Sequence, residues 1–112
     1  MSLELVLTGL GYNVNDALLE QVKRVLSASD FDEKEIEHII NLHEKIKHSD
    51  GFVALSNSED KFKIKCESTI PEIIDEFNEI VQSWASKYKI VIEKLAGKQT
   101  YYILRREDWD RL

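Results

Sequence analysis

The three histidines of the chain are the first candidates for chemistry, because they lie close together at His38, His43 and His48. The apolar residues around them have helical spacing, and a helix turns about 100° per residue. Steps of five residues carry the three side chains to different sides of such a helix. Helical histidines that share a metal ion instead lie three or four residues apart. The spacing therefore argues against a metal site, and no cofactor is predicted.

His43 is the one histidine that falls among the apolar positions of this segment, which are Ile36, Ile39, Ile40 and Ile46. We interpret it as a histidine at the edge of the core that is hydrogen-bonded to a backbone carbonyl. The alternative is a pH-sensitive or catalytic imidazole in a small-ligand pocket near the turn at Gly9 and Gly11. That turn lacks the other residues of a phosphate-binding loop. No nucleophile or acid is identified beside His43, so an enzyme is not predicted.

The chain is acidic as a whole but contains one basic segment. The formal net charge is −6, whereas residues 87–106 contain six basic residues and one acid. Aromatic rings at Tyr101 and Tyr102 lie among these cations, and a basic surface with aromatic rings is typical of nucleic-acid binding. One alternative function is therefore a nucleic-acid-binding domain that uses this hairpin. Its cations would be Lys87, Lys89, Lys94, Lys98, Arg105 and Arg106.

Three observations favour a protein partner over nucleic acid. An acidic chain is unusual for a nucleic-acid binder, and the strand that carries Lys61, Lys63 and Lys65 on one face has no ring on that face. In addition, both faces of segment 100–106 carry bulky apolar side chains, which indicates a strand that is covered on both sides. The predicted cover is a docked C-terminal tail at 107–112, a second copy of the chain or another protein.

Four acids at helical spacing lie on the outer side of a predicted helix at 69–88. They could receive the basic hairpin of a partner, although a solvated helix face is the simpler interpretation. We predict a small protein-interaction or regulatory module without catalytic activity, which forms a homodimer through its C-terminal hairpin. The predicted partner-binding residues are the acids Glu72, Asp75, Glu76 and Glu79 together with Lys98, Tyr101, Ile103, Arg105 and Trp109.

The composition is that of an ordinary soluble domain, with 43% hydrophobic and 32% charged residues among 112. This length suits a single domain, residues 1–112, with a substantial core. The single cysteine, Cys66, shares a strand face with Phe62 and Ile64, and we expect it to be buried. One cysteine cannot form an internal disulfide, and no apolar run is long enough to span a membrane. A cytoplasmic protein is therefore expected.

Hydrophobic periodicity predicts eight elements. They are a strand at 3–9, helices at 15–28 and 32–48, two strands within 52–68, a helix at 69–88, and strands at 89–93 and 100–106. This order, β-α-α-β-β-α-β-β, predicts an α+β fold in which helices pack on one face of an antiparallel sheet. Without the second helix and the last strand, the order is ferredoxin-like. The alternative is a winged-helix-like fold in which the last hairpin is the wing.

Overall fold

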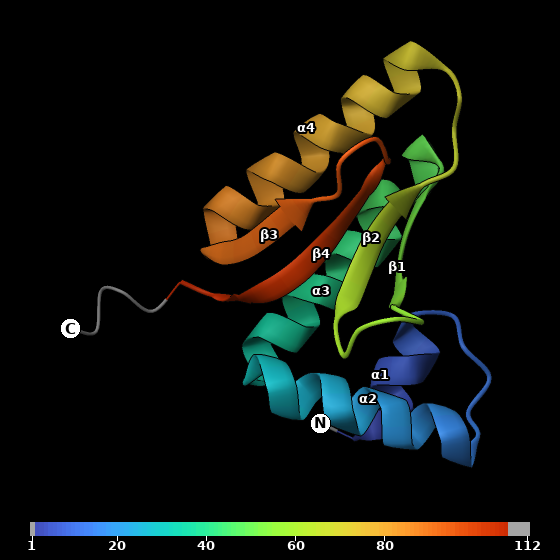
Figure 1. Cartoon of the computed structure of the whole chain (residues 1–112), viewed down its shortest axis with the longest axis vertical. Helices are drawn as coiled ribbons and strands as arrows, with labels where there is room; N and C mark the ends of the chain where they lie inside the picture. Colours follow the sequence, from blue (N-terminus) through green and yellow to red (C-terminus); the bar gives the residue numbers. More distant parts are fainter. Residues whose placement is uncertain (1, 108–112) are drawn as a thin grey trace.

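The computed structural model describes residues 2–107, in which three helices precede a β-hairpin, a long helix and a second β-hairpin (Figure 1). This arrangement confirms the predicted α+β class. No helix within the described range has the length and apolar character needed to cross a membrane. The elements in chain order are α1 (Leu3–Gly9), α2 (Asp16–Ser29), α3 (Glu33–Lys45), the short 3-10 helix η1 (Ile46–Ser49), β1 (Gly51–Leu55), β2 (Phe62–Cys66), α4 (Pro71–Tyr88), β3 (Ile90–Lys94) and β4 (Thr100–Arg106).

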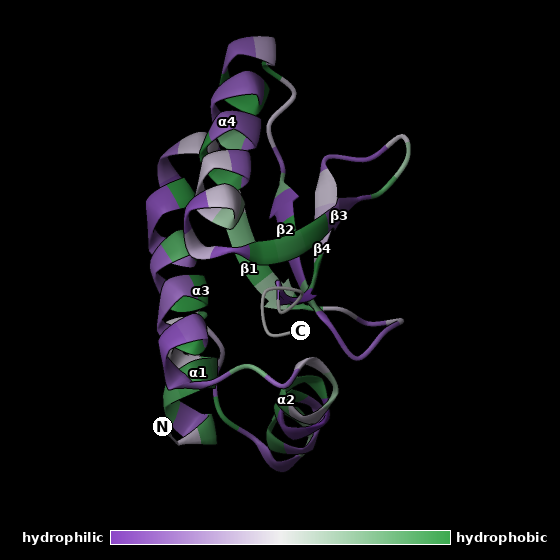
Figure 2. Ribbon diagram, turned by 90° about the vertical axis from the view of Figure 1, so that its left-hand side faces the viewer, coloured by the Kyte–Doolittle hydropathy of each residue, from purple (hydrophilic) through white to green (hydrophobic). Residues whose placement is uncertain are grey.

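The four strands form one antiparallel sheet in the order β1-β2-β4-β3, so β2 and β4 are its central strands. Helices α3 and α4 lie on one side of this sheet, and α1 and α2 lie near the end where β1 turns into β2 (Figures 1 and 2). The two hairpin turns project away from the α3–α4 layer (Figure 2). We call the sheet face that points away from α3 and α4 the open face.

Alternating burial along the strands shows which side chains point to the helices. Along β2, Phe62, Ile64 and Cys66 are buried while Lys63 and Lys65 are half-buried, as the sequence alternation predicted. Along β4, Tyr101 and Ile103 are buried. Their neighbours Tyr102 and Leu104 are half-buried and belong to the open face by strand alternation. The core thus lies between the sheet and the helices, and the open face carries the lysines.

The predicted strand at 3–9 is wrong, because this segment is helix α1. The alternation of Leu3, Leu5 and Leu7 suggested a strand, but Leu3, Val6, Leu7 and Leu10 also have helical spacing. Val6, Leu7 and Leu10 are buried, whereas Leu5 is 62% exposed. The Ser2 hydroxyl caps the helix by accepting a hydrogen bond from the Leu5 amide at 3.2 Å. Packing against α2 and α3 thus decides between two patterns that fit the same residues.

This change removes the first strand of the ferredoxin-like order, which is therefore not confirmed. The observed order has three helices before the first strand. The winged-helix-like alternative is not confirmed either. In the observed sheet, β4 of the last hairpin pairs with β2 and is a central strand.

Side-chain caps begin two of the three longer helices. Asn15 caps α2, and Asp32 with Glu35 forms the reciprocal capping box that begins α3. Helix α4 differs, because it begins at Pro71 with Ile70 at the N-cap position and has no side-chain cap. Thr69, whose hydroxyl could serve as a cap, lies one residue before the N-cap position.

Candidate binding site

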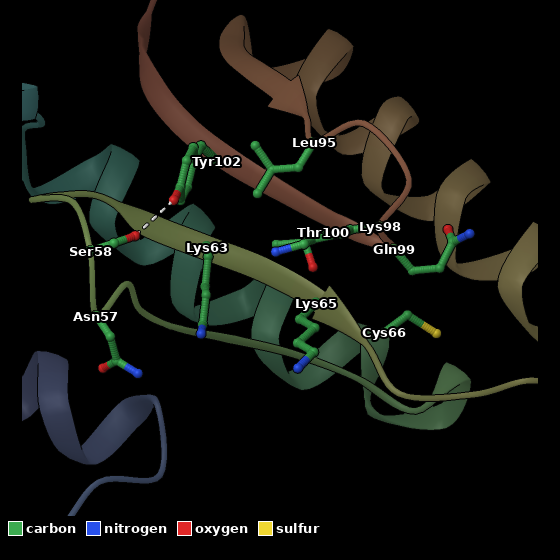
Figure 3. Close-up of a pocket in the computed structure, with 10 residues that line it drawn as sticks. All are labelled: Asn57, Ser58, Lys63, Lys65, Cys66, Leu95, Lys98, Gln99, Thr100 and Tyr102. Carbon is green, nitrogen blue, oxygen red and sulfur yellow. Dashed lines mark hydrogen bonds between the residues drawn. The ribbon is translucent and has the colours of Figure 1, made fainter.

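A hollow of about 450 Å³ lies on the open face of the sheet, between the two hairpin turns (Figure 3). Its floor comes from the central strands β2 and β4, and its walls come from the β1–β2 and β3–β4 turns. We call it the open-face hollow. Its lining residues are Asn57, Ser58, Lys63, Lys65, Cys66, Leu95, Lys98, Gln99, Thr100 and Tyr102.

Three lysines line the open-face hollow from two directions. Lys63 and Lys65 are successive residues of β2 on the same face, and both are half-buried. Lys98 is exposed and comes from the β3–β4 turn across the hollow. Within residues 2–107, none of the three forms an ion pair. Their positive charge is therefore not neutralised by a neighbouring carboxylate.

Tyr102 supplies an aromatic ring to this basic surface. In the sheet it pairs with Lys63 of β2 on one side and with Glu93 of β3 on the other. Its hydroxyl lies 3.3 Å from the Ser58 hydroxyl, and the Lys61 ammonium lies 5.2 Å from the ring centroid (Figure 3 shows the Ser58 contact). Hydrogen bonding by Ser58, and then by Ser56, lowers the pKa of the Tyr102 phenol.

The chemistry available in the hollow is recognition of negative charge. Its lining groups are amines, neutral amides and hydroxyls, one thiol and one aliphatic side chain, without a carboxylate or an imidazole. A general acid–base pair of the usual kind is therefore missing from this lining. Within the described residues, no group of three histidines, cysteines or acids is arranged to hold a metal ion.

The predicted partner-binding residues of the C-terminal hairpin do not form one surface. Tyr101 and Ile103 are 2% and 1% exposed because they point into the core. The Tyr101 hydroxyl donates to the Asn78 side chain at 2.7 Å, which ties β4 to α4. Lys98 lines the open-face hollow and Arg105 is exposed on β4. Trp109 and the rest of the tail after residue 107 lie outside the described residues.

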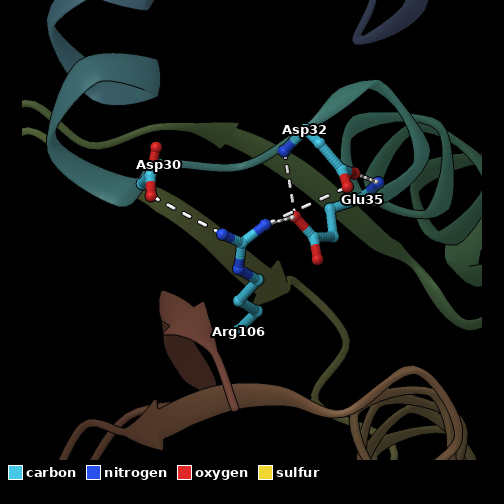
Figure 4. A network of polar contacts seen from close by, with 4 residues as sticks. All are labelled: Asp30, Asp32, Glu35 and Arg106. Atoms are coloured by element: carbon cyan, nitrogen blue, oxygen red, sulfur yellow. Dashed lines mark hydrogen bonds and ion pairs between the residues drawn. The ribbon is translucent and has the colours of Figure 1, made fainter. Parts of the chain in front are cut away.

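Arg106, one of the predicted nucleic-acid-binding cations, belongs instead to an ion cluster (Figure 4). Its guanidinium lies 3.4 Å from Glu35, 3.6 Å from Asp30 and 3.9 Å from Asp32. Its side chain is only 21% exposed. The backbone hydrogen bond from Glu35, more than the charge of Arg106, lowers the pKa of Asp32. Arg106 therefore ties the end of β4 to the α2–α3 junction.

The acidic stripe on α4 consists of Glu72, Asp75, Glu76 and Glu79, and all four side chains are exposed. Helix α4 lies on the covered side of the sheet, so this stripe and the open-face hollow belong to opposite layers of the molecule (Figure 2). Glu76 accepts a hydrogen bond from the Ser49 hydroxyl at 2.9 Å.

His43 is buried, as expected, but its hydrogen bond differs from the predicted one. Its Nδ1 accepts a hydrogen bond from the Val53 amide at 3.0 Å, rather than donating to a carbonyl. The adjacent Leu55 amide donates to the Tyr12 hydroxyl at 2.9 Å. Burial, and then the charge of Lys47, lowers the pKa of His43. His43 does not line the open-face hollow, so it has a structural position at the outer edge of β1.

The hollow was not predicted from the sequence, although its three lysines were named there. Lys63 and Lys65 share a face of β2 that has no aromatic ring. The ring comes from Tyr102 on the neighbouring strand, and that pairing is known only once the strand order is known. Comparison with protein-family models, curated proteins and solved structures found no match to this chain.

Proposed function

We propose that the protein is a binding module that takes an anionic ligand in its open-face hollow. The observation that carries this proposal is that Lys63, Lys65 and Lys98, without carboxylate partners among residues 2–107, line one hollow together with the Tyr102 ring in a protein of net charge −6. Lysines without counterions repel one another, and an anion would relieve that repulsion. The missing acid–base pair supports a binding role over a catalytic one.

Homodimerisation through the C-terminal hairpin is less well supported by this geometry. The apolar residues Tyr101 and Ile103 already contribute to the core of the chain itself. A contact between the basic hollow of one copy and the acidic α4 stripe of another would join opposite layers. Such a head-to-tail contact tends to produce open chains of copies rather than a closed pair.

Titration with inorganic tripolyphosphate tests the proposal, because this probe offers phosphate charge without a base or a peptide. We expect the backbone amide NMR signals of Lys63, Lys65 and Thr100 to shift in a saturable manner. The Lys63→Glu/Lys65→Glu variant should lose the shifts, since it reverses two charges on the floor of the hollow. The matched control, Lys34→Glu/Lys45→Glu, makes the same change of net charge at two exposed lysines of α3 and should retain the shifts.

Shifts spread over the whole chain, or shifts that persist in the Lys63→Glu/Lys65→Glu variant, would contradict the proposal. The amide spectrum of the variant without ligand reports whether the fold is intact. Single replacement of Lys98 by Ala provides a second, milder variant, because Lys98 is exposed in a turn and contributes little to packing.

A further inference from the structure

We infer that the anion bound in the open-face hollow is a single-stranded nucleic acid, with an unpaired base stacked on Tyr102 and phosphates on Lys63, Lys65 and Lys98. This inference rests on the proposed binding function and names the class of its ligand. Proteins that bind single strands combine a positively charged groove with aromatic side chains on which bases stack. The open face brings both features together on its two central strands.

The position of Tyr102 suits base stacking. The residue lies on the open face of the central strand β4 and is half-buried, so part of its ring is accessible. Its contact with Ser58 links the phenol to the β1–β2 turn and restrains the ring (Figure 3). The Lys61 ammonium lies 5.2 Å from the ring centroid and pairs with Glu59 at 3.8 Å, so a base would stack on the part of the ring that Lys61 leaves free.

The lysines are spaced along the path that a bound strand would follow. Lys63 and Lys65 are two residues apart on one strand, which separates their Cα atoms by roughly 7 Å. Lys98 stands on the opposite wall of the hollow. In the sheet register Lys63 lies opposite Tyr102, and Lys65 and Lys98 follow toward the β3–β4 turn. A single strand that runs from the β1–β2 turn to the β3–β4 turn would therefore meet the ring and Lys63 first and the other two lysines next.

The ring of Tyr102 favours nucleic acid over an acidic peptide. The side-chain amides do not decide between them, because the Gln99 amide oxygen lies 3.5 Å from the Asn78 amide nitrogen of α4 and a peptide backbone could also pair with Asn57. A peptide made of acidic residues would satisfy the lysines but has no flat group to stack on the ring.

The nearby acids Glu59 and Asp60 pair with Lys61 and Arg24. Glu93 lies next to Tyr102 on β3, and none of the three acids belongs to the lining of the hollow.

Unpaired bases are required for this mode of binding. A base inside a duplex is stacked and paired, so it cannot lie on a ring at the floor of a hollow between two turns. The acidic α4 stripe also repels nucleic acid from the covered side of the sheet. The open face is therefore the surface that attracts a single-stranded nucleic acid.

Fluorescence anisotropy with a labelled oligothymidylate of about 12 nucleotides tests the inference. Tyr102→Leu should weaken binding about fivefold or more, because it removes the stacking platform. Tyr102→Phe, the matched control, keeps the ring and should bind within about twofold of the parent protein. With three phosphate contacts, affinity should fall about 20-fold between 50 and 200 mM salt.

Two further probes separate failure of this inference from failure of the proposed function. If tripolyphosphate shifts the hollow amides but the oligonucleotide binds no tighter, or Tyr102→Leu binds it like the parent, the ligand is another anion and the inference is overturned. Tighter binding of a labelled oligoglutamate peptide, or of the duplex form of the oligonucleotide, also overturns it. If neither phosphate probe binds, the proposed function fails as well.

Discussion

Gly51 has the least space for an added Cβ among the four glycines of the chain. A Cβ at this position would lie 2.9 Å from the Phe77 ring and 3.0 Å from Ile46 Cβ, both buried. The φ angle of Gly51 is not in the left-handed region, so crowding alone requires glycine here. We expect Gly51→Ala to lower the free energy of unfolding by about 1–3 kcal/mol, measured by urea denaturation.

A double-mutant cycle separates crowding from other effects of the Gly51→Ala substitution. Phe77→Leu makes room beside residue 51, so the combined variant should lose less stability than the sum of the two single losses. Additive losses would show that Phe77 is not the obstacle. Gly97→Ala is the comparison for backbone strain, because Gly97 has a φ of 73° and no atom within 4 Å of an added Cβ.

His43 makes the stability of the fold depend on pH. Burial lowers its pKa in the folded state, so the unfolded chain binds the proton more readily. The neutral ring is also the form whose Nδ1 accepts from Val53. The contribution of His43 to the free energy of unfolding is therefore fully present above about pH 6.5, the pKa of the histidine in the unfolded chain. It is lost as the pH falls toward the lower pKa of the folded state.

The expected slope from His43 approaches about 1.4 kcal/mol per pH unit within that window. Urea denaturation between about pH 5 and 8 measures it. The control is His43→Gln, which retains an acceptor for the Val53 amide but does not titrate. The difference in unfolding free energy between the parent and His43→Gln, followed against pH, isolates the effect of His43 from that of the other titrating groups. If this difference in unfolding free energy stays constant from about pH 5 to 8, the pKa of His43 is not lowered in the folded protein.

At the scale of elements, the edges of the sheet show how the fold limits strand pairing between copies. The outer amides of β1 at Val53 and Leu55 donate to His43 and Tyr12, so they are already satisfied. The other edge strand, β3, has a register irregularity between Val91 and Ile92. Blocked amides and bulges both discourage edge-to-edge association. A dimer formed by strand addition therefore has little support from either edge.

The Arg106 cluster ties β4 to the α2–α3 junction, and Glu35 is its most shielded acid. The Glu35 side chain is 16% exposed, whereas those of Asp30 and Asp32 are 93% and 60% exposed. We expect Arg106→Gln to cost about 1 kcal/mol, chiefly through the lost contact with Glu35. Arg106→Lys should lose less stability than Arg106→Gln, because lysine keeps the positive charge but lacks the planar guanidinium fork. Thermal or urea unfolding at low and high salt measures both losses.

Arg105→Gln is the matched control for the cluster, since Arg105 is the neighbouring arginine, is exposed and forms no ion pair within the described residues. Its replacement should change stability by no more than about 0.5 kcal/mol. Equal losses for Arg105 and Arg106 would mean that the cluster does not stabilise the end of β4.

Local patterns in the sequence identified seven of the nine elements, because strands and helices with one apolar face have distinct periods. The prediction that Phe62, Ile64 and Cys66 share one strand face and the lysines the other is confirmed. The first element was misassigned because it is only seven residues long, and seven residues fit both periods. The hollow could not be predicted, because it depends on β4 inserting beside β2. That pairing joins residues about 40 positions apart.

At the scale of the whole molecule, the distribution of charge between layers sets how fast an anion reaches the hollow. The shortest dimension of the fold is 23 Å. Electrostatic screening acts over roughly 30 Å at 0.01 M salt but only about 8 Å at 0.15 M. The acids of α4 should therefore repel an approaching anion at low salt, even from the opposite layer, and should have almost no effect at physiological salt.

The variant Asp75→Lys/Glu79→Lys tests this effect, and it rests on the proposed anion binding. It moves the net charge from −6 to −2 without changing a residue of the hollow. We expect association with the labelled oligonucleotide, followed by stopped-flow fluorescence, to accelerate severalfold at low salt and to match the parent near 0.15 M. The dissociation rate should stay constant, because contacts in the bound state are unchanged. A slower dissociation rate would instead mean that α4 touches the ligand directly, and the binding surface would then have to include the helical layer.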